Sequence, residues 1–193
     1  MVIQLPEPRL SGKVSIEETL KLRRSVRRFT DHLLTHEEIS QLLWSAQGLR
    51  SGGQRRTAPS AGALYPLELY VVIAEGIFHY DPAQNTLSVV REGDLREELC
   101  RASLNQEFIM EAPLTVAITA VYERIAVRYG KERGARYVYM EVGHAAQNLA
   151  LQAVALGLGS VPVGAFDDAA VHRVLGVPED HEPLYLLPVG HPA

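Results

Sequence analysis

Four arginines and a serine hydroxyl lie within six consecutive residues, at positions 23–28 (RRSVRR). Guanidinium groups bind the oxygens of phosphate or carboxylate in a forked geometry, and a hydroxyl can share the same anion. The segment therefore predicts a binding site for an anionic group. A solvated basic stretch or a salt-bridged turn is the alternative that spacing alone leaves open.

Two segments rich in small residues could bring backbone groups close to a flat ligand. Residues 58–66 (APSAGALYP) precede an apolar run, and residues 157–166 (GLGSVPVGAF) follow a long apolar stretch. Small side chains let backbone N–H and C=O groups approach a ligand closely. The glycine spacing of the second segment fits neither a dinucleotide fingerprint nor a phosphate loop. A plain surface loop and a helix stop are the alternatives.

The other motifs typical of catalytic or metal sites point to no such site in this sequence. The sequence contains no Gly-x-Ser-x-Gly elbow and no His-Glu-x-x-His motif, and its single cysteine, Cys100, is expected to be structural. His144 shares the long apolar stretch with Glu141, Gln147 and Asn148. Several polar groups on one core helix indicate a buried polar cavity or a subunit interface. We therefore assign no catalytic residue and predict no metal site.

The composition is that of one globular domain spanning 1–193. The chain is 47% hydrophobic and 22% charged, with a formal net charge of −4, which excludes intrinsic disorder and argues against nucleic acid as a partner. No apolar run reaches the roughly 20 residues that a membrane span needs. We expect a cytoplasmic protein with no membrane partner.

Capping signals and periodicity place the elements that must hold these segments. Ser15 and Thr35 are predicted N-caps, the latter in a capping box with Glu38, and Asp94 is predicted to cap a third helix. The stretch 134–157 is apolar on most sides and should lie in a core. In chain order we expect an extended arm over 1–14, helices over 15–23 and 36–48, a loop over 49–66, strands over 69–74, 77–80 and 86–90, a helix over 94–103, a strand over 114–121, helices over 134–157 and 168–175, and a strand over 184–189. Hairpins mixed with helices indicate an α+β fold.

The three segments, in this order, resemble the nitroreductase family of FMN-dependent oxidoreductases from residue 15 to residue 190. Residues 23–29 match Arg-x-Ser-x-Arg/Lys-x-Phe, residues 59–62 match the Pro-Ser-rich loop, and residues 157–166 match Gly-Leu-Gly-x-x-Pro-x-x-x-Phe. Within the family, residues 61–66 and 143–149 (GHAAQNL) look most like the branch that contains the azoline dehydrogenases of peptide natural-product pathways.

The resemblance implies an α+β sandwich with a central, mostly antiparallel sheet and a long buried helix, in an intertwined homodimer with FMN at the subunit interface. Arg23 and Ser25 would bind the phosphate with help from Arg24, and Arg27 would lie at the pyrimidine edge of the ring. Asn105, or its neighbour Gln106, would bond the ring carbonyls. The full set of implied cofactor contacts is Arg23, Arg24, Ser25, Arg27, Pro59, Ser60, Ala61, Gly62, Ala63, Asn105, Pro162, Val163, Gly164 and Ala165, with the segment 163–165 supplying backbone contacts, including an N–H near flavin N5.

The activity implied is transfer of hydride from NAD(P)H to flavin N5 and then to a small organic acceptor such as a nitroaromatic or a quinone. A dehydrogenase that uses oxygen as acceptor and a flavin-binding protein without turnover are the alternatives. Phe108 stands where some relatives carry a second cation, and residues 190–193 (GHPA) add no lysine or arginine, so the arginines at 23–28 must hold the phosphate. The Lys-Tyr pair that azoline dehydrogenases use is absent. The acceptor and the choice between NADH and NADPH stay open.

Overall fold

The computed structural model describes residues 2–50, 53 and 55–193. One sheet runs through it in the order β1-β4-β3-β2-β5-β7-β6, and every pairing of neighbouring strands is antiparallel. The strands are β1 (Val2–Gln4), β2 (Leu67–Ile73), β3 (Gly76–Asp81), β4 (Thr86–Glu92), β5 (Leu114–Ala120), β6 (Gly159–Ser160) and β7 (Glu182–Gly190). The predicted α+β class with a mostly antiparallel sheet is confirmed. Residues 51, 52 and 54 of the predicted 49–66 loop, and residue 1 of the arm, lie outside the described residues.

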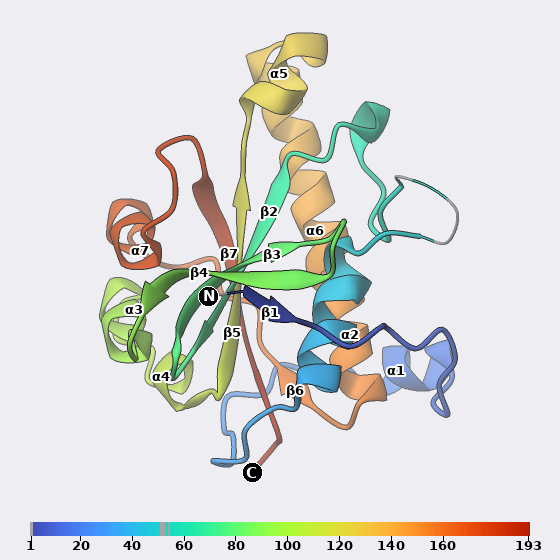
Figure 1. Cartoon of the computed structure of the whole chain (residues 1–193), viewed down its shortest axis with the longest axis vertical. Coiled ribbons are helices and arrows are strands. Elements are labelled where there is room, and N and C mark those ends of the chain that lie inside the picture. The colour runs from blue at the N-terminus through green and yellow to red at the C-terminus, as the bar shows by residue number, and fades with distance from the viewer. Residues whose placement is uncertain (1, 51–52, 54) are drawn as a thin grey trace.

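Helices cover both faces of the sheet, in two layers that Figure 1 shows on either side of β2 and β5. One layer holds α1 (Ile16–Leu22), α2 (His36–Gln47) and α6 (Lys131–Ala155); the other holds α3 (Arg96–Ala102), α4 (Phe108–Glu111) and α7 (Asp168–Leu175). The helix α5 (Glu123–Tyr129) precedes α6 at one end, and a 3-10 turn, η1, spans Ala61–Ala63. No helix among the described residues is long and apolar enough to cross a membrane.

Strand alternation divides the interior into two cores. In β2, Leu67, Leu69 and Val71 pack into the core beneath α2 and α6, whereas Tyr70 and Val72 pack into the core beneath α3 and α7. Side chains of a strand point alternately to opposite faces, so a strand covered on both faces is apolar almost throughout. The exception in β2 is Glu68, a carboxylate inside a buried strand.

Local signals located most helix starts correctly. The Ser15 hydroxyl accepts from the Glu18 backbone N–H at 3.1 Å, and Thr35 with Glu38 forms the predicted capping box. The prediction that Asp94 caps the third helix is wrong. That helix begins at Arg96, and the Asp94 carboxylate accepts instead from the Arg96 backbone N–H and side chain, in the turn before the helix.

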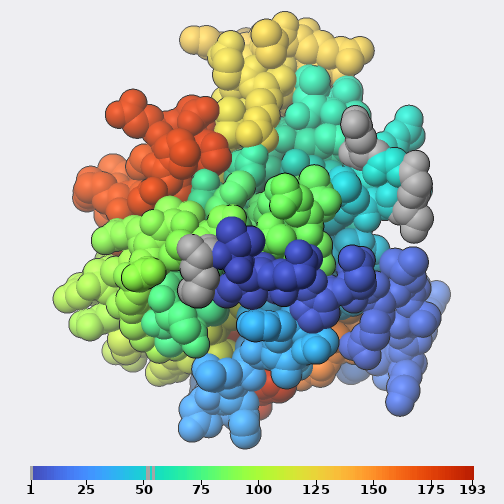
Figure 2. All heavy atoms as spheres, viewed as in Figure 1, coloured from blue at the N-terminus to red at the C-terminus, as the bar shows by residue number. Residues whose placement is uncertain are grey.

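The N-terminal arm is extended, as predicted, and its first residues add an edge strand. Ile3 pairs with Leu87 of β4. The arm then crosses the hairpin and α2 on the surface, where Figure 2 shows it running toward α1. The Ser40 hydroxyl donates to the Pro6 carbonyl, and the Arg9 N–H donates to Gln41 Oε1 at 2.8 Å. The sequence did not predict β1, β6, α4 or α5.

The long helix α6 differs from its prediction in one respect. Within one chain it is buried on one side only. Tyr139 is 61% exposed and Met140 52% exposed, and Gly143, His144 and Gln147 continue the same exposed stripe. A helix needs a layer over each apolar face to bury it, and one chain provides that layer over only one side of α6. The stripe therefore leaves apolar surface open to solvent.

Candidate functional site

The arginine segment lies beside the short strand β6. Ser25 forms a parallel bridge with Ser160, and the Val26 N–H donates to the Ser160 carbonyl at 3.0 Å. This approach requires glycine at position 159, where an added Cβ would lie 2.7 Å from the Val26 Cβ. Two sequence motifs more than a hundred residues apart thus meet in space.

The guanidinium groups of this segment are not engaged by acidic side chains. Among the described residues, none of the four arginines at 23, 24, 27 and 28 forms a salt bridge or donates a side-chain hydrogen bond. The Arg27 guanidinium lies 5.8 Å from the centre of the Phe108 ring, within cation–π range. The described residues therefore do not support the alternative of a salt-bridged turn, and the donors remain open to an anion.

Two further predicted segments join this cluster. The Gln106 side chain donates to the carbonyls of Ser103 and Ala165, at 2.9 and 2.8 Å, and so fastens the 103–106 turn to residues 162–166. Asn105 is exposed, with φ of 56°, and its side chain has no hydrogen bond among the described residues. The structure thus uses Gln106 to hold the turn and leaves the Asn105 amide available.

Only some of the backbone N–H groups of residues 162–165 are free to bind a ligand. The Val163 N–H donates to the Leu186 carbonyl at 2.8 Å, and Pro162 has no N–H. Gly164 and Ala165 are exposed, and neither N–H has a backbone acceptor among the described residues. The available N–H groups of this segment therefore belong to Gly164 and Ala165.

The remaining predicted segment lies elsewhere. Figure 1 shows η1 at the end of the molecule that carries α5, whereas β6 and the connection from α1 to α2 lie at the opposite end. Gly62 has φ of +63°, and an added Cβ would lie 2.9 Å from the Tyr129 Oη, which fixes this turn against the end of α5. One chain therefore divides the predicted cofactor contacts into two groups. The group at the β6 end holds Arg23, Arg24, Ser25, Arg27, Asn105, Pro162, Val163, Gly164 and Ala165. The group at the α5 end holds Pro59, Ser60, Ala61, Gly62 and Ala63.

A buried polar network lies beneath the η1 segment. Arg56 donates to Gln47 Oε1 at 2.9 Å and to the Leu67 carbonyl at 3.1 Å, and its guanidinium lies 5.1 Å from the centre of the Tyr65 ring. Burial lowers the pKa of Arg56, against the charges of Glu68 and Glu141. The Ser60 hydroxyl accepts from the Tyr65 N–H at 2.9 Å. This network sets the shape of residues 56–65 from below.

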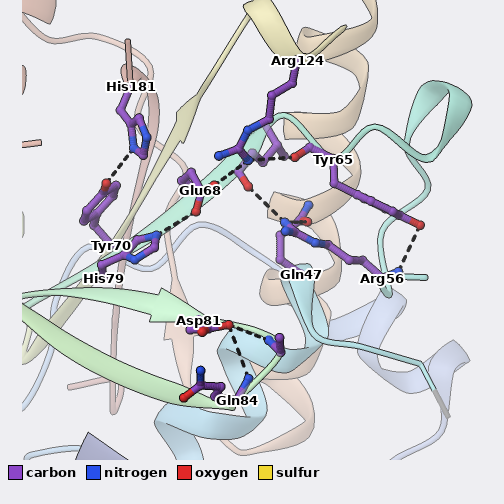
Figure 3. Close-up of polar contacts among 12 residues, drawn as sticks. Gln47, Arg56, Tyr65, Glu68, Tyr70, His79, Asp81, Gln84, Arg124 and His181 are labelled. Carbon is purple, nitrogen blue, oxygen red and sulfur yellow. Dashed lines mark hydrogen bonds and ion pairs between the residues drawn. The ribbon is translucent and has the colours of Figure 1, made fainter. Parts of the chain in front are cut away.

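Glu68 connects that network to a second one on the other face of β2 (Figure 3). Its carboxylate binds His79 Nε2 at 2.7 Å and an Arg124 nitrogen at 2.5 Å, and the same Arg124 nitrogen donates to the Tyr65 carbonyl. Burial raises the pKa of Glu68, but the His79 hydrogen bond and the Arg124 charge outweigh it and lower the pKa to about 2. Sequence reasoning missed Arg56, Glu68 and Arg124; the one signal was an acidic residue inside an apolar strand.

Comparison with known proteins gives the same assignment as the motifs. The nitroreductase family model matches residues 20–191. A protein of Methanocaldococcus jannaschii named "Putative nitroreductase MJ1384" is 43% identical over 196 residues, which cover 98% of this chain and 96% of that protein. The crystal structure of a "putative nitroreductase" from Ralstonia eutropha has 33% identity and a TM-score of 0.90, over 100% of this chain and 90% of that one.

A more distant match is a trifolitoxin-processing protein. The trifolitoxin-processing protein TfxB of Rhizobium leguminosarum is 28% identical over 131 residues, which cover 63% of this chain and 35% of that protein. This match is consistent with the branch that residues 61–66 and 143–149 indicated. The resemblance drawn from the three motifs is confirmed: this chain belongs to the nitroreductase family, whose members are FMN-dependent oxidoreductases with NAD(P)H as co-substrate.

Proposed function

We propose that this protein uses NAD(P)H to reduce a small organic acceptor, such as a nitroaromatic or a quinone, with FMN as its cofactor. The observation that carries the proposal is the set of four arginines, none of them in a salt bridge within the described residues, held beside Gly159 by the Ser25–Ser160 bridge. A cofactor that carries a phosphate needs free hydrogen-bond donors, and the guanidinium groups of this family-typical motif can provide them.

The chemistry of the donor set fits FMN. Arg23 and Ser25 would hold the phosphate with Arg24 beside them, and Arg27 would place positive charge at the pyrimidine edge of the ring. The free Asn105 amide can bond ring carbonyls, and the Gly164 and Ala165 N–H groups can reach the ring edge. When bound, FMN supplies the hydride transfer itself. The protein binds, orients and excludes water, which explains why no catalytic triad is needed.

The site would be completed by a second copy of the chain. Residues 59–63 lie at the opposite end of the molecule from the arginines, so a partner must supply this segment if both contact one cofactor. The exposed stripe of Tyr139, Met140 and Gly143 on α6 supports such pairing, because contiguous exposed apolar surface is typical of interaction sites. We therefore propose a homodimer with two FMN sites at its interface.

A second activity has one observation in its favour. The similarity to a trifolitoxin-processing protein is consistent with the azoline dehydrogenase branch, whose activity would be oxidation of a small or peptide-derived substrate with oxygen as acceptor. The missing Lys-Tyr dipeptide argues against azoline oxidation itself. A flavin-binding protein without turnover is the remaining alternative.

Visible absorption under anaerobic conditions separates these functions. We expect purified protein incubated with FMN to be yellow and to bleach on addition of NADH or NADPH. Bleaching by an organic donor and by neither nucleotide would support the dehydrogenase. Bound flavin that no donor bleaches would indicate a carrier, and protein that does not bind FMN would overturn the proposal.

A further inference from the structure

One buried acid among the described residues has no close hydrogen-bond partner. Glu141 lies on α6 with 1% of its surface exposed, and neither carboxyl oxygen has a hydrogen-bond partner among the described residues. The Nε2 atom of Gln47, at the end of α2, is also buried and has no close hydrogen-bond acceptor among the described residues. Buried polar groups are almost always hydrogen-bonded, and an exception calls for a functional explanation.

The surroundings of Glu141 come from three separate segments. The Ser60 hydroxyl and the Gln47 amide face the carboxyl, and Arg56 is the charged group of the described residues that acts on it. Burial raises the pKa of Glu141 to about 7, against the opposing effects of Ser60, Arg56 and Gln47. Arg56 is already committed to Gln47, to the Leu67 carbonyl and to the Tyr65 ring, so it cannot fully neutralise the carboxylate.

The proton of the Ser60 hydroxyl is also unassigned. The Ser60 oxygen accepts from the Tyr65 N–H at 2.9 Å, and the contact of the hydroxyl with the Glu141 carboxyl is too loose to satisfy that acid. A serine oxygen can accept two hydrogen bonds while its own proton goes to a third group. The proton can therefore point inward to Glu141 or outward to a ligand that lies on residues 59–63.

We propose that Glu141 is a positioning residue for the 59–63 segment, and that its ionised fraction takes up a proton from solvent when the flavin engages the Ser60 hydroxyl. Without cofactor, Ser60 donates to the ionised carboxylate. With cofactor, Ser60 donates to a flavin oxygen, and the carboxylate, having lost its donor, accepts a proton and donates to the Ser60 oxygen in turn. The inference rests on the proposed function, because it needs FMN at this segment.

Proton uptake makes FMN affinity depend on pH. Since Glu141 is more fully protonated in the bound state than in the free state, the affinity falls as pH rises above the pKa of free Glu141. If binding raises that pKa by about one unit, the Kd for FMN rises about fivefold between about pH 6 and pH 8. The phosphate of FMN titrates near pH 6, so the effect must be read against a variant in which only Glu141 is changed.

Glu141→Gln provides that comparison, because glutamine keeps the size of the side chain and donates at every pH. Isothermal titration of FMN into flavin-free protein, in two buffers of different ionisation enthalpy, counts the protons taken up. We expect uptake by the wild type at pH 7 to exceed that of both Glu141→Gln and Ser60→Ala. We also expect the fivefold rise in Kd to be absent from both variants.

A second measurement covers the case in which a variant fails to fold. The infrared difference spectrum of wild-type protein, with FMN minus without, should gain the C=O band of a protonated carboxylic acid. Wild-type protein that binds FMN with no such band, or with the proton uptake of Glu141→Gln, would overturn the inference and leave the proposed function standing. Wild-type protein that does not bind FMN would overturn both.

Discussion

Replacing Glu68 by glutamine tests whether the carboxylate network stabilises the fold. The side chain is 10% exposed and binds both His79 and Arg124. A pKa lowered from 4.5 to about 2 corresponds, at 1.36 kcal/mol per unit, to about 3 kcal/mol of stability. The Arg124 side chain is 38% exposed, so solvent screens part of its charge. We therefore expect Glu68→Gln to lower the free energy of unfolding by about 2–3 kcal/mol at neutral pH.

The stability lost in Glu68→Gln should depend on pH, and the lowered pKa of Glu68 sets the direction of that dependence. Because the folded-state pKa of Glu68 is lowered, its contribution is fully present above the unfolded value of 4.5 and is lost as pH falls toward 2. The difference between wild type and Glu68→Gln should therefore be constant from about pH 7 to pH 5 and shrink to about half by pH 3.

Urea unfolding of flavin-free protein, followed by Trp44 fluorescence at one fixed protein concentration, measures both effects. Fixed concentration and absent cofactor keep assembly and ligand binding out of the comparison. Glu98→Gln is the matched control, since the Glu98 side chain is 45% exposed and its pair with Arg101 spans 3.8 Å; we expect it to cost less than about 0.5 kcal/mol. Equal losses for the two variants, or a difference that does not shrink in acid, would refute the reasoning.

Three further substitutions test the site and the fold. Arg23→Ala should weaken FMN binding by about 1.5–3 kcal/mol, the worth of a charged hydrogen bond; a Kd from flavin fluorescence that equals the wild-type value would remove Arg23 from the phosphate site. Gly159→Ala places a methyl group 2.7 Å from the Val26 Cβ, so it should lower the free energy of unfolding by about 1–3 kcal/mol in urea and weaken FMN binding as well. Asp167→Ala removes the carboxylate that accepts from the Ala170 N–H at the start of α7, so unfolding should become easier by about 1 kcal/mol, which an unchanged Tm would contradict.

The sequence located most elements because their signals are local. Ser15 and Thr35 satisfy N–H groups three residues ahead, and the apolar run of β2 is visible in seven residues. Asp94 shows where such signals mislead, because an aspartate can bond a nearby N–H in a turn as readily as at a cap. The short strand β6 and the helix α4 carry too few residues for any period to show.

For the candidate site too, some features could be predicted from local sequence and others required the tertiary structure. The residue types and order of segments 23–29, 59–62 and 157–166 sufficed for the family, since those motifs are contiguous in the chain. Only the tertiary structure showed that the first and third meet at Gly159 while the second lies at the other end. It also showed that Glu68 is paired and that, in the part of the chain that the structure describes, Glu141 has no close hydrogen-bond partner. Such facts depend on side chains that packing brings together from distant parts of the chain, and no local pattern encodes which distant groups will meet.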